Sequence, residues 1–305
     1  LELVNRVKTG HVTYNDYNYE QPKIPQEMSR GGPLDVDLKL YDYPGRYVDP
    51  AMGQVRSSEW MSEYIVDNEQ IEASSDVMRL VSGSGFNISE HPRSEINRDY
   101  LMLSVTHTGQ NPRVHEDESS ELPTTYFNQF TCIPRSTIFR APKLPAPVVD
   151  GPQTAVVVGP AGEEIYTDPM GRIKVQFHWD RYGMVDEHSS CWIRVSQSMA
   201  APTWGAVYLP RIGHEVVVTF LEGDPDRPLV TGAVYNGLHN PPYSLPDNKT
   251  RTTFRTQTHK GDGYNELSFE DEANQEEIYI IPILLALIKI YIEHLHSIHH
   301  LQNIL

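Results

Sequence analysis

Cysteines and basic residues are scarce in this chain of 305 residues. It has two cysteines, Cys132 and Cys191, and 25 Lys and Arg against 41 Asp and Glu, which gives a net charge of −16. We expect both cysteines to be buried thiols in a reducing compartment, although their spacing alone leaves a disulfide open. Because phosphate contacts need clustered Lys and Arg, the charge argues against a nucleic-acid-binding protein. Solubility and long-range repulsion account for the acidity.

Two features are missing at the start of the chain. Leu1 to Arg6 has no apolar core region, so we expect no signal peptide there, and the sequence does not begin with Met. We therefore expect a fragment that begins inside a domain. Hydrophobic residues make up 39% of the chain, which is a lean globular composition, and the length is enough for two domains with a hydrophobic core.

The stretch from Gly171 to Tyr235 has the clearest strand pattern. Apolar residues at 173–179 alternate with polar ones, which is the period of a half-buried strand. The run at 216–221 is apolar on most of both faces, as expected for a strand that is covered twice. Gly, Asp and Pro at 223–228 mark a turn. With 154–159 as a first strand, these short segments predict a five-stranded Greek-key barrel of the OB type.

The first half of the chain predicts a mixture of helix and strand. A helix is predicted over 57–75, capped by one of its first two serines, because Trp60, Tyr64 and Ile71 recur near helical spacing. Strands are predicted at 77–82, where Gly83 and Gly85 follow, at 100–106 and at 125–133. The acidic segment 111–123 predicts a solvated loop.

Residues 1–55 are irregular and rich in aromatic residues. Tyr14, Tyr17 and Tyr19 could form an interface, because Tyr combines a large contact area with a polar tip. A strand packed on its own domain is the simpler interpretation, and we favour it.

Proline-rich segments divide the chain. Four prolines in 140–153 predict a semi-rigid linker and a domain boundary, and the prolines at 241–246 predict a second stiff connection.

Residues 251–280 are polar and rich in Thr, with short alternating patches such as Glu266 to Glu270. A single chain of this kind cannot bury enough apolar surface to stay folded, so we expect stacking or oligomerisation to supply the missing contacts.

Four segments together carry a resemblance to a known family. They read PMGRIKVQFHWDRYG, SSCWIRVSQ, WGAVYLPRIGHEVVVTFLEGDPDRPLVTGAVYNG and NELSFEDEANQEEIYI. The chain resembles the VgrG family, the spike proteins of type VI secretion systems, which are related to the hub and spike proteins of contractile phage tails. The resemblance runs from about Asp35 to Ile280. It implies a mainly β fold with some α: a partial hub-like α+β domain at 1–145, an OB-type barrel at 146–240 and the start of a trimeric β-prism needle at 241–280.

Residues 281–305 do not match that family. They are dense in Ile and Leu, where the family continues with polar, repeating strands. Pro282 to Ile292 is too short to span a bilayer core of about 30 Å. We attribute this tail to an altered reading frame, a truncation scar or mis-assigned residues.

The resemblance implies a mechanical function without catalysis or cofactor. A homotrimeric spike would rest on the secretion tube (Hcp rings) at its hub end and carry a PAAR-type tip protein and effectors at its needle end. Sheath contraction would drive it through a target membrane without making it an integral membrane protein. It would assemble in the bacterial cytoplasm and then be injected into the target cell. We expect Tyr- and Trp-rich strands, with Trp179 and Trp192, to form the contacts between subunits of this closed assembly.

One group of residues has the composition of a catalytic site. His178, His188 and Cys191 lie near Asp180 and Asp186 in the sequence, as a Cys-His-Asp nucleophilic set would. We interpret the cysteine as a structural residue within an ordinary strand.

Two other motifs are incomplete as sites for chemistry. Ser189-Ser190 lacks the turn that exposes a hydrolase serine, and Gly83-Ser84-Gly85 lacks the remaining glycines and the Lys of a phosphate loop. We therefore predict no catalytic residue.

The tail holds a possible metal site. Its histidines could bind zinc, since two or three of them would share a helix face: His294, His296, His299 and His300. No acidic or Cys partner is arranged around them, and a short His-rich tract is a weak signal. We predict no metal or cofactor site.

Two other classes are alternatives to a structural spike. A phage-type spike enzyme that degrades the cell wall would carry two catalytic carboxylates in a domain between barrel and needle, but 235–241 runs straight on. An OB-type oligonucleotide-binding module would need a basic face with exposed aromatic residues. Arg172 and Lys174 are available for such a face, but nearby Asp and Glu outnumber them.

Overall fold

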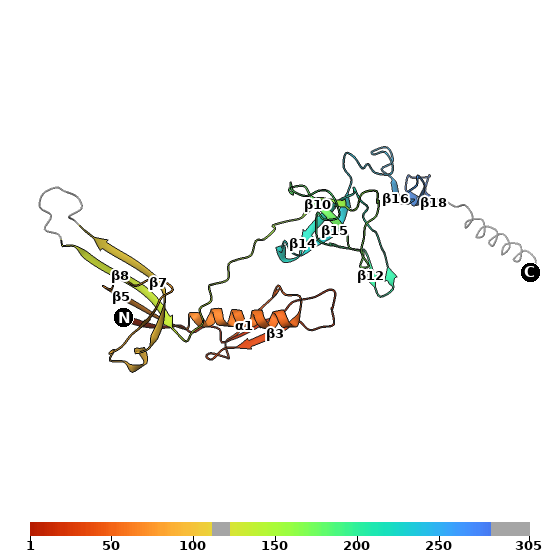
Figure 1. The fold of residues 1–305 in the computed structure, drawn as a ribbon. Helices are drawn as coiled ribbons and strands as arrows, with labels where there is room; N and C mark the ends of the chain where they lie inside the picture. Colours follow the sequence, from red (N-terminus) through yellow and green to blue (C-terminus); the bar gives the residue numbers. More distant parts are fainter. Residues whose placement is uncertain (112–122, 282–305) are drawn as a thin grey trace, which may run out of the picture. The chain divides into compact units, whose positions relative to one another are not determined.

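The computed structural model describes residues 1–111 and 123–281 and is mainly β (Figure 1). Contacts divide the chain into two compact units, Leu1–Leu144 and Pro145–Leu305. Within the described residues there is one α-helix, α1, and all other long elements are strands. This confirms the predicted fold class. No helix among these residues has both the length and the apolar character that crossing a membrane requires.

The first unit contains a five-stranded sheet with the order β1-β5-β8-β7-β6. Its neighbouring strands are antiparallel: β1 (Glu2–Asn5), β5 (Glu69–Ser75), β6 (Gly85–Asn87), β7 (Asp99–Gln110) and β8 (Thr125–Pro134). Ile71, Tyr100 and Cys132 are fully buried in its core. The strands predicted at 100–106 and 125–133 are confirmed, and both are longer than expected, forming the extended ribbon of Figure 1.

The same unit holds α1 (Pro50–Val66) against a small sheet with the order β3-β2-β4. Its strands are β2 (His11–Tyr14), β3 (Met28–Gly31) and β4 (Lys39–Asp42). Tyr14 and Trp60 pack together in the core between the helix and this sheet, with ring centres 3.7 Å apart. Tyr14 therefore packs within its own unit, as the simpler interpretation predicted, whereas Tyr17 is 55% exposed.

The predicted helix over 57–75 is wrong at both ends. The helix begins earlier because Asp49 caps it, accepting the Met52 amide at 2.8 Å, and a proline occupies the first turn. Ser57, predicted as a cap, is a buried residue inside the helix. Ile71 belongs to β5, where Gln70 and Ile71 are buried.

The strand predicted at 77–82 is also wrong. The Ser75 hydroxyl accepts the Val77 amide at 3.0 Å, which turns the chain out of β5. Gly83 has a φ of +83°, a left-handed conformation that suits glycine, and the next strand begins only at Gly85. The acidic loop predicted at 111–123 falls mostly outside the described residues.

The second unit contains the predicted barrel, a five-stranded sheet with the order β10-β9-β14-β15-β11. Its strands are β9 (Gln153–Val158), β10 (Lys174–Phe177), β11 (Arg194–Val195), β14 (Glu215–Phe220) and β15 (Pro228–Val234). Ile173, just before β10, forms a bridge with Ile193, just before β11. This bridge joins the two edge strands, so the sheet curls on itself. A short hairpin, β12 (Ala200–Ala201) and β13 (Trp204–Gly205), leaves the barrel between β11 and β14.

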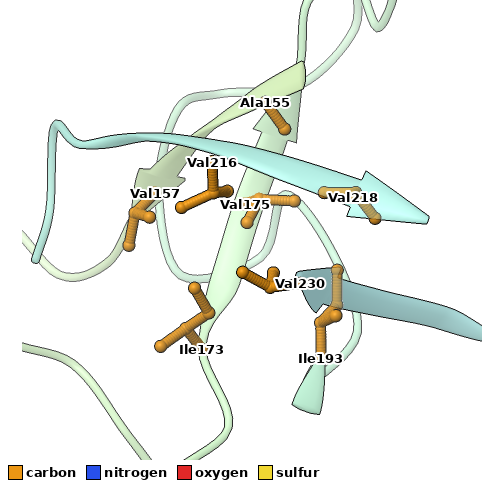
Figure 2. Packing of buried hydrophobic residues seen from close by; sticks show 8 residues of the cluster. All are labelled: Ala155, Val157, Ile173, Val175, Ile193, Val216, Val218 and Val230. Atoms are coloured by element: carbon orange, nitrogen blue, oxygen red, sulfur yellow. The ribbon is translucent and has the colours of Figure 1, made fainter. Parts of the chain in front are cut away.

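The core of the barrel consists of small and branched apolar side chains that point toward one another (Figure 2). Each of them is at most 1% exposed: Ala155, Val157, Ile173, Val175, Ile193, Val216, Val218 and Val230. The alternation predicted for 173–179 holds for Ile173 and Val175, but Trp179 is 68% exposed. We predicted that the strand at 216–221 is buried on both faces. In β14 one face is buried, but Val217 on the other face is only half-buried, so the prediction holds in part.

No helix or strand occurs from Arg135 to Pro152, in agreement with the predicted linker. The first part of this segment lies on α1. The Lys143 amide donates to the Glu63 carboxylate at 2.8 Å, and the Lys143 ammonium lies 4.3 Å from the centre of the Trp60 ring.

The two cysteines differ in exposure. Cys132 is buried, as predicted, but Cys191 is exposed, and both are free thiols. The prediction of a buried Cys191 is wrong because the strand there is only two residues long and begins after it, at Arg194.

After the barrel, three antiparallel strands form a separate sheet: β16 (Arg251–Gln257), β17 (Tyr264–Glu270) and β18 (Glu277–Ile281). Arg255 lies opposite Glu266, and Leu267 opposite Ile280. We call it the terminal sheet.

Candidate functional site

The two faces of the terminal sheet differ sharply in composition. Successive side chains of a strand point to opposite faces, so the pairing assigns each residue to one face. The polar face carries all the ionic side chains of the three strands, together with hydroxyl side chains and the single apolar residue Ile281: Arg251, Thr253, Arg255, Gln257, Tyr264, Glu266, Ser268, Glu270, Glu277, Tyr279 and Ile281. The apolar face carries Phe254, Leu267, Phe269, Ile278 and Ile280, beside the uncharged polar residues Thr252, Thr256 and Asn265.

The apolar face is the exposed one. Phe254, Ile278 and Ile280 are 57%, 65% and 66% exposed, whereas Ser268 on the polar face is buried and the Glu266 side chain is 0% exposed. A sheet of a soluble monomer normally buries its apolar face and leaves charged residues in water. A contiguous apolar surface of this kind marks an interaction site.

The polar face is sealed by a network around Glu266. One carboxylate oxygen accepts a hydrogen bond from the Tyr243 hydroxyl at 2.5 Å, and the other accepts one from Arg255 Nε at 2.6 Å. The guanidinium carbons of Arg251 and Arg255 each lie 4.6 Å from the centre of the Tyr243 ring. Arg251 also binds Glu270, with an Nε–Oε2 distance of 3.3 Å. The segment before β16 therefore contributes Tyr243 to a fully paired ionic cluster.

The network changes the titration of Glu266. Burial alone would raise its pKa, but hydrogen bonds from Tyr243, Arg255 and Ser268 outweigh burial and hold the pKa below its ordinary value. A carboxylate with a lowered pKa in the folded state stabilises the fold above its unfolded pKa, and this stability is lost as the pH falls through the folded pKa.

Acid should therefore destabilise the second unit through Glu266. Between pH 7 and pH 3, we expect the free energy of unfolding to fall more steeply for the natural chain than for Glu266→Gln, because Gln does not titrate. The difference should begin near the unfolded pKa of about 4.3. Urea unfolding followed by tryptophan fluorescence at a series of pH values measures it. Parallel pH profiles for the two chains would contradict the lowered pKa of Glu266.

A second ionic cluster attaches the terminal sheet to the barrel. Glu164, in the loop after β9, accepts the Lys260 amide at 3.0 Å and lies 3.3 Å from His259 Nδ1. Both partners belong to the turn between β16 and β17. Arg211 of the barrel donates to the Gln257 carbonyl at 2.6 Å. The hydrogen bond from the Lys260 amide is the main cause that lowers the pKa of Glu164.

The structure does not bring the Cys-His-Asp candidates together as a nucleophilic set. Asp180 accepts the amides of Tyr182 and Gly183 and so shapes a turn. His178 Nε2 lies 3.8 Å from a Glu215 oxygen, and Cys191 is exposed.

The other candidates for chemistry give no site either. Asp186 accepts the backbone amide of His188 at 2.8 Å, which is a turn contact. Across residues 1–111 and 123–281, no cluster of three or more His, Cys, Asp or Glu could hold a metal ion. The tail histidines 294, 296, 299 and 300 lie outside the described residues. The absence of a catalytic residue remains a prediction.

The basic residues proposed for an oligonucleotide face are engaged by other residues of the second unit. Arg172 Nε donates to Asp168 at 2.6 Å. The Lys174 ammonium donates to the Glu187 carbonyl at 2.5 Å and lies 5.1 Å from the centre of the Trp192 ring. This observation gives no support to nucleic-acid binding.

Two family models match the chain. The phage tail baseplate hub (GPD) model covers residues 1–113, and the type VI secretion system/phage-baseplate injector OB domain model covers residues 154–235. The fold and these matches define the class of protein: a hub joined to an injector OB barrel, as in phage baseplates and type VI secretion systems.

Similar proteins of known name identify the family within this class. The type VI secretion system spike protein VgrG3 of Vibrio cholerae is 41% identical over 284 residues, which cover 92% of this chain and 28% of that protein. The actin cross-linking toxin VgrG1 of another Vibrio cholerae strain is 42% identical, over 92% of this chain and 26% of the toxin. The chain belongs to the VgrG family. It spans less than a third of the length of these two relatives.

A solved structure of an Escherichia coli protein is also similar. It is the c3393 protein, described as a component of the type VI secretion system with structural similarity to the T4 bacteriophage tail proteins gp27 and gp5. It is 19% identical, with a TM-score of 0.42, and the match covers 73% of this chain and 56% of that one.

Proposed function

We propose that this chain is the hub, barrel and first needle sheet of a homotrimeric spike that a type VI secretion machine drives into target cells. The hub-like domain takes 1–145, the OB barrel 146–240 and the start of the needle 241–280. The observation that carries this proposal is the exposed apolar face of the terminal sheet. Three copies that met through this face would bury Phe254, Ile278 and Ile280 around a three-fold axis.

The apolar face is a surface where copies of this chain can meet despite their charge. The chain carries a net charge of −16, so two copies repel each other through most of their surface. The apolar face contains none of that charge, because the ionic residues of the sheet lie on the sealed polar face. Copies can therefore meet there without burying unpaired carboxylates.

Family membership supports our proposal for the remaining partners. We propose that the hub end rests on the tube protein Hcp and that the needle end carries a PAAR-type tip protein and effectors. The spike assembles in the bacterial cytoplasm and then crosses the target membrane mechanically. Trp179, which is 68% exposed, is available for contacts between barrels, whereas Trp192 packs against Tyr166 with ring centres 4.9 Å apart.

We propose that the region described here does not act as an enzyme. One relative is named a toxin, but this chain matches only 26% of its length, so that name gives no activity to the shared region. The cell-wall-degrading and oligonucleotide-binding alternatives have no observation in their favour.

The mass of the chain in solution tests the proposed function. The monomer mass is 34.7 kDa, and we expect light scattering on a sizing column to report three copies. The measurement should be repeated over a range of protein concentrations, because association follows mass action. One copy at every concentration would contradict the assignment of the apolar face as the trimer interface.

A further inference from the structure

We propose that Tyr243, Arg255 and Glu266 form a lock that fixes the register of the terminal sheet. The register decides which face is apolar, so the lock determines the surface offered to the other copies. The proposal rests on the proposed function for that last step, but the lock itself lies within one chain.

The need for a lock follows from the geometry of strands. A shift of one residue between β16 and β17 turns every side chain of the shifted strand to the other face. Arg255 would then lie among Leu267 and its apolar neighbours, and Phe254 would move to the polar face. β16 itself specifies its faces weakly, since it reads Arg-Thr-Thr-Phe-Arg-Thr-Gln and has Phe254 as its single large apolar residue.

The contacts of Glu266 are specific to the observed register. Its side chain is 0% exposed, and each of its two oxygens has its own donor, Tyr243 and Arg255. A shifted strand would remove Arg255 and leave a buried carboxylate without its cation, which is strongly unfavourable. Buried polar groups that specify register at little gain in stability are known from coiled coils.

Tyr243 extends the lock beyond the sheet. It lies 23 positions before Glu266 in the chain, and its ring lies against both Arg251 and Arg255. Arg255 also donates to the Pro242 carbonyl at 3.3 Å. The segment that leads into β16 is thus tied to the same residues that pair β16 with β17. Tyr243 is a positioning residue, because it acts through Arg255 and Glu266.

An intrachain disulfide can report the register. Thr256 and Asn265 are exposed cross-strand partners, so Thr256→Cys with Asn265→Cys places two thiols opposite each other only in the observed register. Cys191→Ser removes the exposed natural thiol, and Cys132 is buried in the other unit. The measured quantity is the yield of the disulfide under mild oxidation, read from peptide mass after digestion of the single-chain band of a non-reducing denaturing gel, because Thr256 and Asn265 share the apolar face and could otherwise link two copies.

We expect Tyr243→Phe and Glu266→Gln to lower this yield by at least about threefold, because each removes a contact that exists only in the observed register. Glu272→Gln is the matched control: it neutralises an exposed carboxylate in the turn between β17 and β18 and should leave the yield unchanged. Unchanged yields in both Tyr243→Phe and Glu266→Gln would overturn the lock.

A further variant separates register from stability. Arg255→Leu with Glu266→Leu replaces the ion pair by apolar side chains, which commonly preserves stability. We expect this chain to stay folded by circular dichroism while the disulfide yield remains low. A yield restored to that of the natural pair would overturn the proposal, since packing alone would then set the register. Light scattering tests the trimer separately: a monomeric chain with a lock-dependent yield would contradict the proposed function and retain the lock.

Discussion

Ile278→Asp is expected to convert the trimer into single chains. Ile278 is 65% exposed in one chain, so the substitution costs the isolated chain little. In the proposed trimer, three carboxylates would be buried close together on an apolar face without a partner. A penalty of several kcal/mol corresponds to at least about a hundredfold weaker association. Light scattering over a dilution series measures the loss.

The control for this variant is Gln275→Asp. It adds the same charge to an exposed position in the turn between β17 and β18, away from the apolar face. Its mass should equal that of the natural chain. A trimeric Ile278→Asp chain would show that copies meet elsewhere, for instance through barrel surfaces that contain Trp179.

Ile173→Ala should remove about 2–5 kcal/mol from the free energy of unfolding of the second unit. Ile173 is 1% exposed and lies in the barrel core, next to the bridge that joins the two edge strands (Figure 2). The smaller side chain leaves a cavity among Val175, Ile193 and their neighbours, which the curled sheet cannot fill without distortion.

Urea unfolding followed by tryptophan fluorescence measures this loss, because three of the four tryptophans, 179, 192 and 204, belong to the second unit. Leu238→Ala is the control. Leu238 is 89% exposed, so the loss of its side chain should change the stability by less than about 0.5 kcal/mol. Equal effects of the two substitutions would contradict the observed core.

The barrel could be predicted from the sequence because its strands alternate with a period of two. Ile173 and Val175 are buried as that period requires. The predicted helix starts too late because the strongest start signal, Asp49 followed by a proline, lies upstream of its aromatic residues. The strand predicted at 77–82 has the right composition, but the Ser75 hydroxyl and Gly83 turn the chain there. Local hydrogen bonds of this kind override strand propensity.

The site could be predicted only in part. The alternation at Glu266 to Glu270 indicates two different faces, and the polar composition predicts oligomerisation. A period of two does not tell which face is covered. The polar face is covered because Tyr243, which is distant in sequence, bonds Glu266 and because the strand pairing sets Arg255 opposite Glu266. Both contacts are tertiary contacts, and a local sequence pattern does not predict them.

Because only one of the two cysteines is exposed, each chain can be labelled with a single dye. Burial raises the pKa of Cys132 to about 12, and the thiolate is the form that reacts with a maleimide dye, so Cys132 is protected in the folded protein. Cys191 is exposed and lies two residues before the core residue Ile193. Brief labelling of the natural chain therefore attaches one fluorophore to each copy. Counting photobleaching steps on individual particles then gives the number of copies in an assembled spike without any engineered tag.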